Sequence, residues 1–264
     1  MQMIETNGVR LHVSDEGPRD GFAVVFANSL GTDFRVWDAV LPHLPEGLRL
    51  IRYDKRGHGL SDCPAAPYHM GDLVKDAAGV MDTLKVRSAL FVGLSIGGII
   101  AQGLAAERPD LVRAMVLADT GAKIGTPQMW EDRVAAVRAG GIEALEGPIL
   151  ERWFSKDFRE NRQGELAAWR HMLCRTPVEG YAGCSLAIAE TDLVESTSRL
   201  SLPTLAIVGS EDGSTPPDLV RETADLISGS RFEVIRGAGH LPCVEQPQEM
   251  ARLITEFMKE NDLG

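Results

Sequence analysis

Short, continuously apolar runs alternate along this 264-residue chain with segments that have the period of an amphipathic helix. A strand covered on both faces lacks the polar alternation of a half-exposed strand, so such runs are typical of a parallel sheet buried between helices. We therefore predict an α/β fold, a mostly parallel sheet with helices on both faces. The predicted strands cover residues 23–29, 48–54, 89–95, 114–120, 204–210 and 231–237.

One interval breaks this alternation. Between residues 122 and 195 no buried strand is expected, only helical segments separated by glycine and proline. Trp130, Trp153 and Trp169 lie there, so the interval has apolar surface to pack against the rest of the chain. We predict a helical cap inserted before the penultimate strand. It divides the chain into a first core part at 1–121, a cap at 122–195 and a second core part at 196–264.

Charge and composition exclude several classes of partner. The net charge of −11 disfavours nucleic acid and anionic membrane surfaces. No apolar run approaches the ~18 residues that indicate a membrane span, and the N-terminal stretch lacks the apolar centre of a secretory signal. We expect a cytoplasmic protein that acts on a small molecule, with its four scattered cysteines reduced.

A serine stands between glycines where the third buried run should pass into a helix. The stretch VGLSIGGIIAQGLA places Ser95 in a G-x-S-x-G pattern with an apolar run before it and a small-residue helix after it. In that context the pattern predicts a sharp strand-to-helix turn that exposes the hydroxyl as a nucleophile. Gly93 and Gly97 remove side chains that would clash in such a turn.

The nucleophile needs a base, and the base needs an acid that orients it. His240, in RGAGHLPCVEQP, follows the last predicted strand and is the candidate base, whereas His58 in DKRGHG is expected to be structural. Asp212 follows the penultimate strand and is the preferred acid, because the order serine, aspartate, histidine suits this architecture. Asp119, one strand earlier, is the rival acid.

The same sheet edge should carry an oxyanion hole. The backbone N–H of Ile96, directly after the serine, is one expected donor. The strand at 23–29 ends in Asn-Ser-Leu-Gly, and its loop opens at the same edge, so the amide of Leu30 is the expected second donor.

With these motifs in this order, the chain resembles the α/β-hydrolase superfamily along its whole length. FANSLGTDFRVWD, RYDKRGHGLSD and VGLSIGGIIAQGLA carry the superfamily resemblance. NSLG and the cap segment TPVEGYAGCSLAIAETDL are similar to the 3-oxoadipate enol-lactonase family. The resemblance implies hydrolysis of a carboxylated enol-lactone to 3-oxoadipate in the β-ketoadipate pathway of aromatic degradation, with neither a cofactor nor a metal.

A substrate carboxylate would require a cation from the cap. The candidates are Arg133, Arg138, Arg152 and Arg170, with Lys123 weaker. We assign Arg133 and Arg138 to substrate binding, with Trp130 and Trp153 as pocket walls. The alternatives are another serine hydrolase, such as a small-ester carboxylesterase or a carbon–carbon bond hydrolase, and a small-molecule receptor that keeps the fold.

Overall fold

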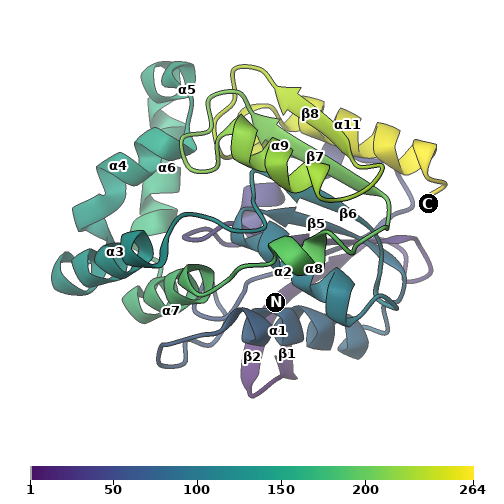
Figure 1. The fold of residues 1–264 in the computed structure, drawn as a ribbon, viewed down its shortest axis with the longest axis horizontal. Helices are drawn as coiled ribbons and strands as arrows, with labels where there is room; N and C mark the ends of the chain where they lie inside the picture. The colour runs from purple at the N-terminus through teal and green to yellow at the C-terminus, as the bar shows by residue number, and fades with distance from the viewer. Residues whose placement is uncertain (1) are drawn as a thin grey trace.

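The computed structural model describes residues 2–264 and contains one eight-stranded sheet (Figure 1). The strand order is β1-β2-β4-β3-β5-β6-β7-β8, and every neighbouring pair from β4 to β8 is parallel. The predicted mostly parallel α/β fold is therefore confirmed. The strands are β1 (Gln2–Thr6), β2 (Val9–Glu16), β3 (Ala23–Ala27), β4 (Arg49–Tyr53), β5 (Ala89–Leu94), β6 (Val112–Ala118), β7 (Thr204–Gly209) and β8 (Arg231–Ile235).

The first two strands form an antiparallel hairpin at one edge of the sheet. Asn7 and Gly8 connect them, both with positive φ (47° and 74°), which a two-residue turn of this kind requires. β2 pairs antiparallel with β4, so the antiparallel part of the sheet is confined to this edge.

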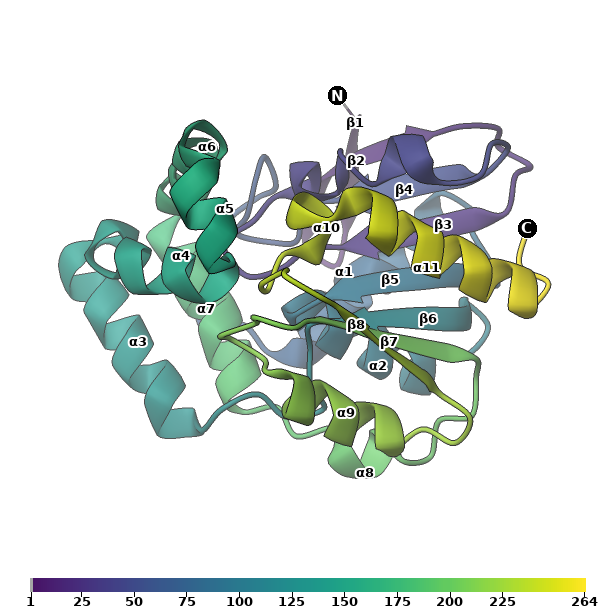
Figure 2. The same ribbon diagram turned by 90° about the horizontal axis from the view of Figure 1, so that it is seen from above.

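Helices cover both faces of the sheet. α1 and α2 pack together on one side, and α11 crosses the other side (Figures 1 and 2). The core strands β3, β5 and β7 are buried along their whole length, as their apolar sequences indicate. The helices of the core are α1 (Met70–Thr83), α2 (Ile96–Glu107), α8 (Val194–Thr197), α9 (Pro217–Asp225), α10 (Pro242–Glu245) and α11 (Pro247–Glu260), with 3₁₀ turns η1 (Phe34–Trp37) and η2 (Leu41–His43).

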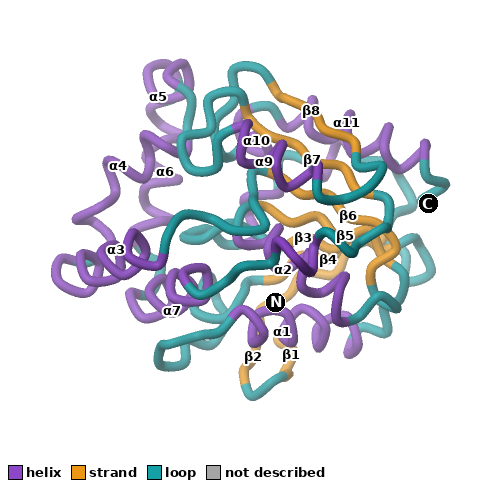
Figure 3. The backbone as a smooth tube through the Cα atoms, viewed as in Figure 1, coloured by secondary structure: helices purple, strands orange, loops and turns teal. Residues whose placement is uncertain are grey.

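A group of helices between β6 and β7 stands beside the sheet, and we call α3–α7 the cap helices. They are α3 (Pro127–Gly140), α4 (Glu146–Trp153), α5 (Lys156–Asn161), α6 (Gln163–Cys174) and α7 (Val178–Ala189), with the 3₁₀ turn η3 (Ile142–Leu145) after α3. Loops that follow the strands lie between the cap helices and the sheet (Figure 3). The division of the chain at residues 122 and 195 stays a prediction.

No helix within residues 2–264 has both the length and the apolar character needed to cross a membrane.

Candidate active site

Ser95 occupies a strained turn between β5 and α2. Its φ of 57° and ψ of −119° lie where residues with a side chain are uncommon, and such strain concentrates at functional sites. A Cβ added to Gly93 would lie 2.2 Å from the Gly97 carbonyl oxygen, and one on Gly97 would lie 2.2 Å from that of Ala27. Both glycines are therefore required by the close backbone packing that holds this turn.

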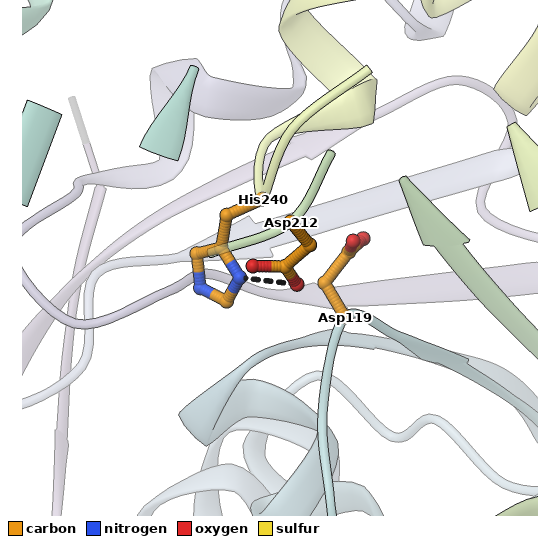
Figure 4. Close-up of side chains that lie close together, drawn as sticks. All are labelled: Asp119, Asp212 and His240. Atoms are coloured by element: carbon orange, nitrogen blue, oxygen red, sulfur yellow. Dashed lines mark hydrogen bonds and ion pairs between the residues drawn. The ribbon is translucent and has the colours of Figure 1, made fainter. Parts of the chain in front are cut away.

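His240 is hydrogen-bonded to Asp212, as the sequence predicts for a base and its orienting acid. The Nδ1–H of His240 donates to Asp212 Oδ2 at 2.9 Å (Figure 4). Thr215 Oγ1 donates to the same oxygen at 2.6 Å, and the amides of Ser214 and Thr215 donate to Oδ1 at 2.7 and 3.0 Å. Burial opposes ionisation of Asp212, but the charge of His240 and these hydrogen bonds hold its pKa below the usual value.

Ser95 and His240 line one cavity, although no hydrogen bond joins them among residues 2–264. His240 Nε2 instead lies 3.4 Å from the hydroxyl of Ser29 in the oxyanion loop. Catalytic hydrogen bonds are often long without substrate and shorten in the complex. The arrangement therefore suits a serine activated by histidine.

Asp119, the rival acid, lies beside Asp212 but does not contact the histidine. Its Oδ1 accepts a hydrogen bond from the Gly209 amide at 2.9 Å, and its buried Oδ2 has no partner within residues 2–264. One polar atom each from Asp119, Asp212 and His240 lie within 4.8 Å of one another. Burial first, and then the negative charge of Asp212, raise the pKa of Asp119 well above the usual value. Asp119 therefore keeps its proton to higher pH in the folded protein than in the unfolded chain.

Replacing Asp119 with asparagine should stabilise the protein, and by more as the pH rises. The unfolded carboxyl releases its proton near pH 4, whereas the folded one keeps it to higher pH. The contribution of Asp119 to stability therefore falls as pH rises from about 4 through its folded pKa, and D119N removes this loss. Melting temperatures between pH 4 and pH 7 test it, with the exposed Asp225→Asn as control. A D119N gain that is constant or shrinks with pH would contradict a raised pKa of Asp119.

The expected oxyanion donors lie on two loops at this edge of the sheet. Ile96 is the first residue of α2, where backbone N–H groups have no partner inside the helix. In the Asn-Ser-Leu-Gly loop, the Gly31 amide donates to His58 Nε2 at 3.0 Å, so it is already used. The amide of Leu30 makes no hydrogen bond within residues 2–264 and stays available. His58 thus has the structural role that the sequence predicts.

The cavity above Ser95 holds about 180 Å³. This is small beside the roughly 300–1,000 Å³ of sites for drug-sized ligands, so it suits a small substrate. Its walls combine polar and apolar side chains, and the predicted Trp130 and Trp153 are among the apolar ones. Two arginines, Arg133 and Arg152, also line it.

Neither of these two arginines pairs with a carboxylate within residues 2–264, although both lie in a partly closed space. The Arg133 guanidinium stacks over the Trp130 ring, 4.6 Å from its centroid. Burial first, and then the positive charge of Arg133, lower the pKa of Arg152. An anion between these two neighbouring cations would offset their mutual repulsion.

The other three cations considered for the substrate carboxylate pair with acidic side chains outside the cavity. Arg138 lies outside the cavity lining and pairs with Glu179 at 3.4 Å, so the structure does not bring this predicted substrate-binding residue to the cavity of Ser95. Arg170 pairs with Glu146 at 2.7 Å, and Lys123 with Asp192 at 2.8 Å. On α3, Arg133 and Arg138 are five residues apart and point in different directions, which a helical period of 3.6 residues explains.

Some residues of the site were not assigned from sequence. Ser29 and Tyr181 line the cavity, and Thr215 orients Asp212. Thr215 follows Asp212 by three residues in a turn-forming stretch, a spacing at which an aspartate commonly binds backbone amides. No comparable local signal marks Tyr181, because α7 reaches the cavity only through the fold.

A larger cavity, of about 600 Å³, lies between the cap helix α6 and the core. Its lining includes His12, Phe34 and Trp169, but none of Ser95, Asp212 and His240. Size alone therefore does not locate the active site, and the chemistry of the lining residues does.

Comparison with known proteins finds relatives over nearly the whole chain. The model of the alpha/beta hydrolase family matches residues 24–253. 3-Oxoadipate enol-lactonase 2 of Acinetobacter baylyi is 34% identical over 95% of this chain and 94% of its own length. The enol-lactonase structure from Burkholderia xenovorans LB400 has a TM-score of 0.94 at 35% identity, covering 98% of this chain and 100% of its own. A malate-bound thermophilic esterase from Thermogutta terrifontis has a TM-score of 0.92 at 29% identity, covering 99% of both chains.

Proposed function

Because this chain belongs to the alpha/beta hydrolase family, and is an ester-hydrolysing enzyme like its relatives, we propose that it opens the ring of a small carboxylated lactone. Ser95 acts as nucleophile, His240 as base and Asp212 as the orienting acid. The proposed substrate is 3-oxoadipate enol-lactone, hydrolysed to 3-oxoadipate in the degradation of aromatic compounds. The names of the Acinetobacter and Burkholderia relatives support this choice.

The observation that carries the proposal is the pair of unpaired arginines in the cavity of Ser95. A guanidinium binds a carboxylate through two parallel hydrogen bonds, which fixes orientation as well as charge. A carboxylate held by Arg133 and Arg152 would direct the rest of a small substrate toward Ser95. A neutral ester has no carboxylate that could form an ion pair with these arginines.

The first half of the reaction forms an acyl-enzyme. Ser95 Oγ attacks the lactone carbonyl while His240 Nε2 takes its proton, and the amides of Leu30 and Ile96 bind the oxyanion. Each such donor contributes about 3 kcal/mol to transition-state stabilisation. Collapse of the intermediate breaks the ring C–O bond and leaves an enol oxygen, which receives the proton from His240. The enol then tautomerises to the ketone, which makes ring opening favourable.

The second half releases the product. Water gives a proton to His240 and attacks the acyl-enzyme carbonyl, and the same two amides bind the second oxyanion. Ser95 leaves as the alcohol after taking the proton back from His240. Asp212, ionised and hydrogen-bonded to Nδ1, stabilises the imidazolium in both halves.

Substitution of the cavity arginines should weaken binding of the carboxylated substrate selectively. Arg133→Met and Arg152→Met should each raise KM for the enol-lactone by about 10- to 100-fold, because a hydrogen bond to a charged group contributes about 1.5–3 kcal/mol. KM for a neutral short-chain ester should change little. Steady-state kinetics on both substrates measure this, and Arg138→Met, on the same cap but outside the cavity, should resemble the natural enzyme. Equal effects on both substrates would show that these arginines do not bind the substrate carboxylate.

A carboxylesterase for small neutral esters is the second candidate, and the similarity to the Thermogutta esterase favours it. The same three catalytic residues would serve it, so the distinction depends on the arginines. In that case the neutral ester would be the better substrate, and the arginine variants would keep their activity toward it.

A further inference from the structure

Lys55 is a buried cation to which the reaction above gives no role. It follows β4 in the sequence DKRGHG, and only 1% of its surface is exposed. No carboxylate among residues 2–264 forms an ion pair with it. Burial lowers its pKa to about 8. Removing an ammonium group from water is costly, so its presence here needs a reason.

The contacts of Lys55 lead to the oxyanion loop. Its Nζ donates to the Ser29 carbonyl at 2.6 Å and to the Thr32 carbonyl at 3.3 Å. The Ser29 carbonyl belongs to the peptide unit whose other end is the N–H of Leu30. A hydrogen bond accepted by a peptide carbonyl polarises the unit and strengthens its N–H as a donor. A charged donor produces the larger effect.

The amides of the two following residues, Gly31 and Thr32, already donate hydrogen bonds within the protein and are not free to bind an oxyanion. The Gly31 amide donates to His58 Nε2 at 3.0 Å, and the Thr32 amide donates to the Ser29 carbonyl at 3.2 Å. Of the amides of residues 30–32, only that of Leu30 is without a partner in the described chain. The free amide, that of Leu30, thus belongs to the peptide unit whose carbonyl binds the Lys55 ammonium group.

We propose that Lys55 is a positioning residue of the oxyanion hole, which holds and polarises the Ser29–Leu30 peptide so that the Leu30 N–H binds the tetrahedral intermediate more strongly. This inference rests on the proposed function, since it takes Leu30 as an oxyanion donor. It concerns acyl transfer by Ser95 and not the identity of the substrate.

Loss of the ammonium group would leave no carbonyl of the loop without a donor. The Ser29 carbonyl keeps the amide and the hydroxyl of Thr32, the latter at 2.9 Å. The Thr32 carbonyl keeps the side-chain amide of Asn28. A methionine fills similar space without the buried charge. Lys55→Met should therefore fold with unchanged or higher stability. If the role of Lys55 were only structural, its removal would lower the stability.

The test uses p-nitrophenyl acetate and an alkylboronic acid, so that it does not depend on the lactone. The boronic acid forms a tetrahedral adduct on serine with an oxygen in the oxyanion hole, and such analogues report transition-state binding. Acylation rates come from the p-nitrophenol burst, and the boronic acid gives an inhibition constant. The variants are Lys55→Met and, as a matched control, the exposed Lys75→Met. Ser95→Ala establishes that both probes report on Ser95.

In Lys55→Met the acylation rate should fall about 10- to 100-fold, less than the ~10²–10³-fold loss caused by removing an oxyanion donor. The boronic acid inhibition constant should rise by a similar factor, with KM and melting temperature maintained. A lowered melting temperature with unchanged rate and inhibition would make Lys55 purely structural and overturn the inference. If Lys55→Met does not fold, Lys55→Gln replaces it, and full activity of a folded Lys55→Gln would also overturn it. Inhibition that survives Ser95→Ala would instead reject the proposed function.

Discussion

Replacement of Ser95 by alanine is expected to abolish lactone hydrolysis and leave a folded protein. The rate constant should fall by about 10⁴- to 10⁶-fold, the range found when a triad serine is removed. The turn itself is held by backbone groups that alanine retains: the Ser95 amide donates to Ala118 at 2.9 Å, and its carbonyl accepts from Thr120 at 2.6 Å. Steady-state kinetics and circular dichroism on the same preparation measure both effects.

A serine of no catalytic importance supplies the control. Ser198→Ala, in an exposed turn after α8, should keep full activity. Activity of Ser95→Ala within tenfold of the natural enzyme would show that another group attacks the substrate. Loss of activity together with loss of the folded spectrum would instead be read as a stability effect, and the boronic acid would then be used to probe Ser95 directly in the natural protein.

Asp212→Asn should lower the rate constant by about 10⁴-fold, as loss of the corresponding carboxylate does in serine proteases. Asp212 accepts the Nδ1–H of His240 at 2.9 Å and so fixes the tautomer that leaves Nε2 free to act as base. An amide side chain can offer an N–H instead, which favours the wrong tautomer. Asp119→Asn should change the rate constant by less than tenfold, because Asp119 accepts a hydrogen bond from the Gly209 amide and makes none with His240.

The two aspartates are matched controls for one another, since they lie side by side and are both buried. Measurement of the rate constant across pH for both variants separates their roles. A larger loss for Asp119→Asn than for Asp212→Asn would show that Asp119, after β6, is the acid that supports His240.

Much of the fold could be predicted because its central strands are buried on both faces. A strand such as β3, with all five residues buried, has a continuously apolar sequence, and the turn at Asn7-Gly8 has a specific backbone requirement. The packing of the cap helices could not be predicted in the same way. Their amphipathic patterns indicate which residues are buried but do not say against which part of the chain.

The same difference explains the outcome at the site. Ser95, Asp212 and His240 follow strands of a parallel sheet, and the sheet brings the carboxyl ends of its strands to one edge. The choice between Arg138 and Arg152 depended on where the cap helices lie, which no local pattern gives. The role of Lys55 depends on a contact across 26 residues of sequence, between two loops that meet only in the folded protein.

The most direct measurement of the central claim is a competition assay in which the natural enzyme receives 3-oxoadipate enol-lactone and a neutral short-chain ester together. Their ratio of kcat/KM compares transition-state binding of the two substrates under identical conditions. The unpaired Arg133 and Arg152 predict a preference for the carboxylated lactone of about 100-fold or more, from two hydrogen bonds to a charged group. Equal values, or a preference for the neutral ester, would contradict a dedicated lactonase.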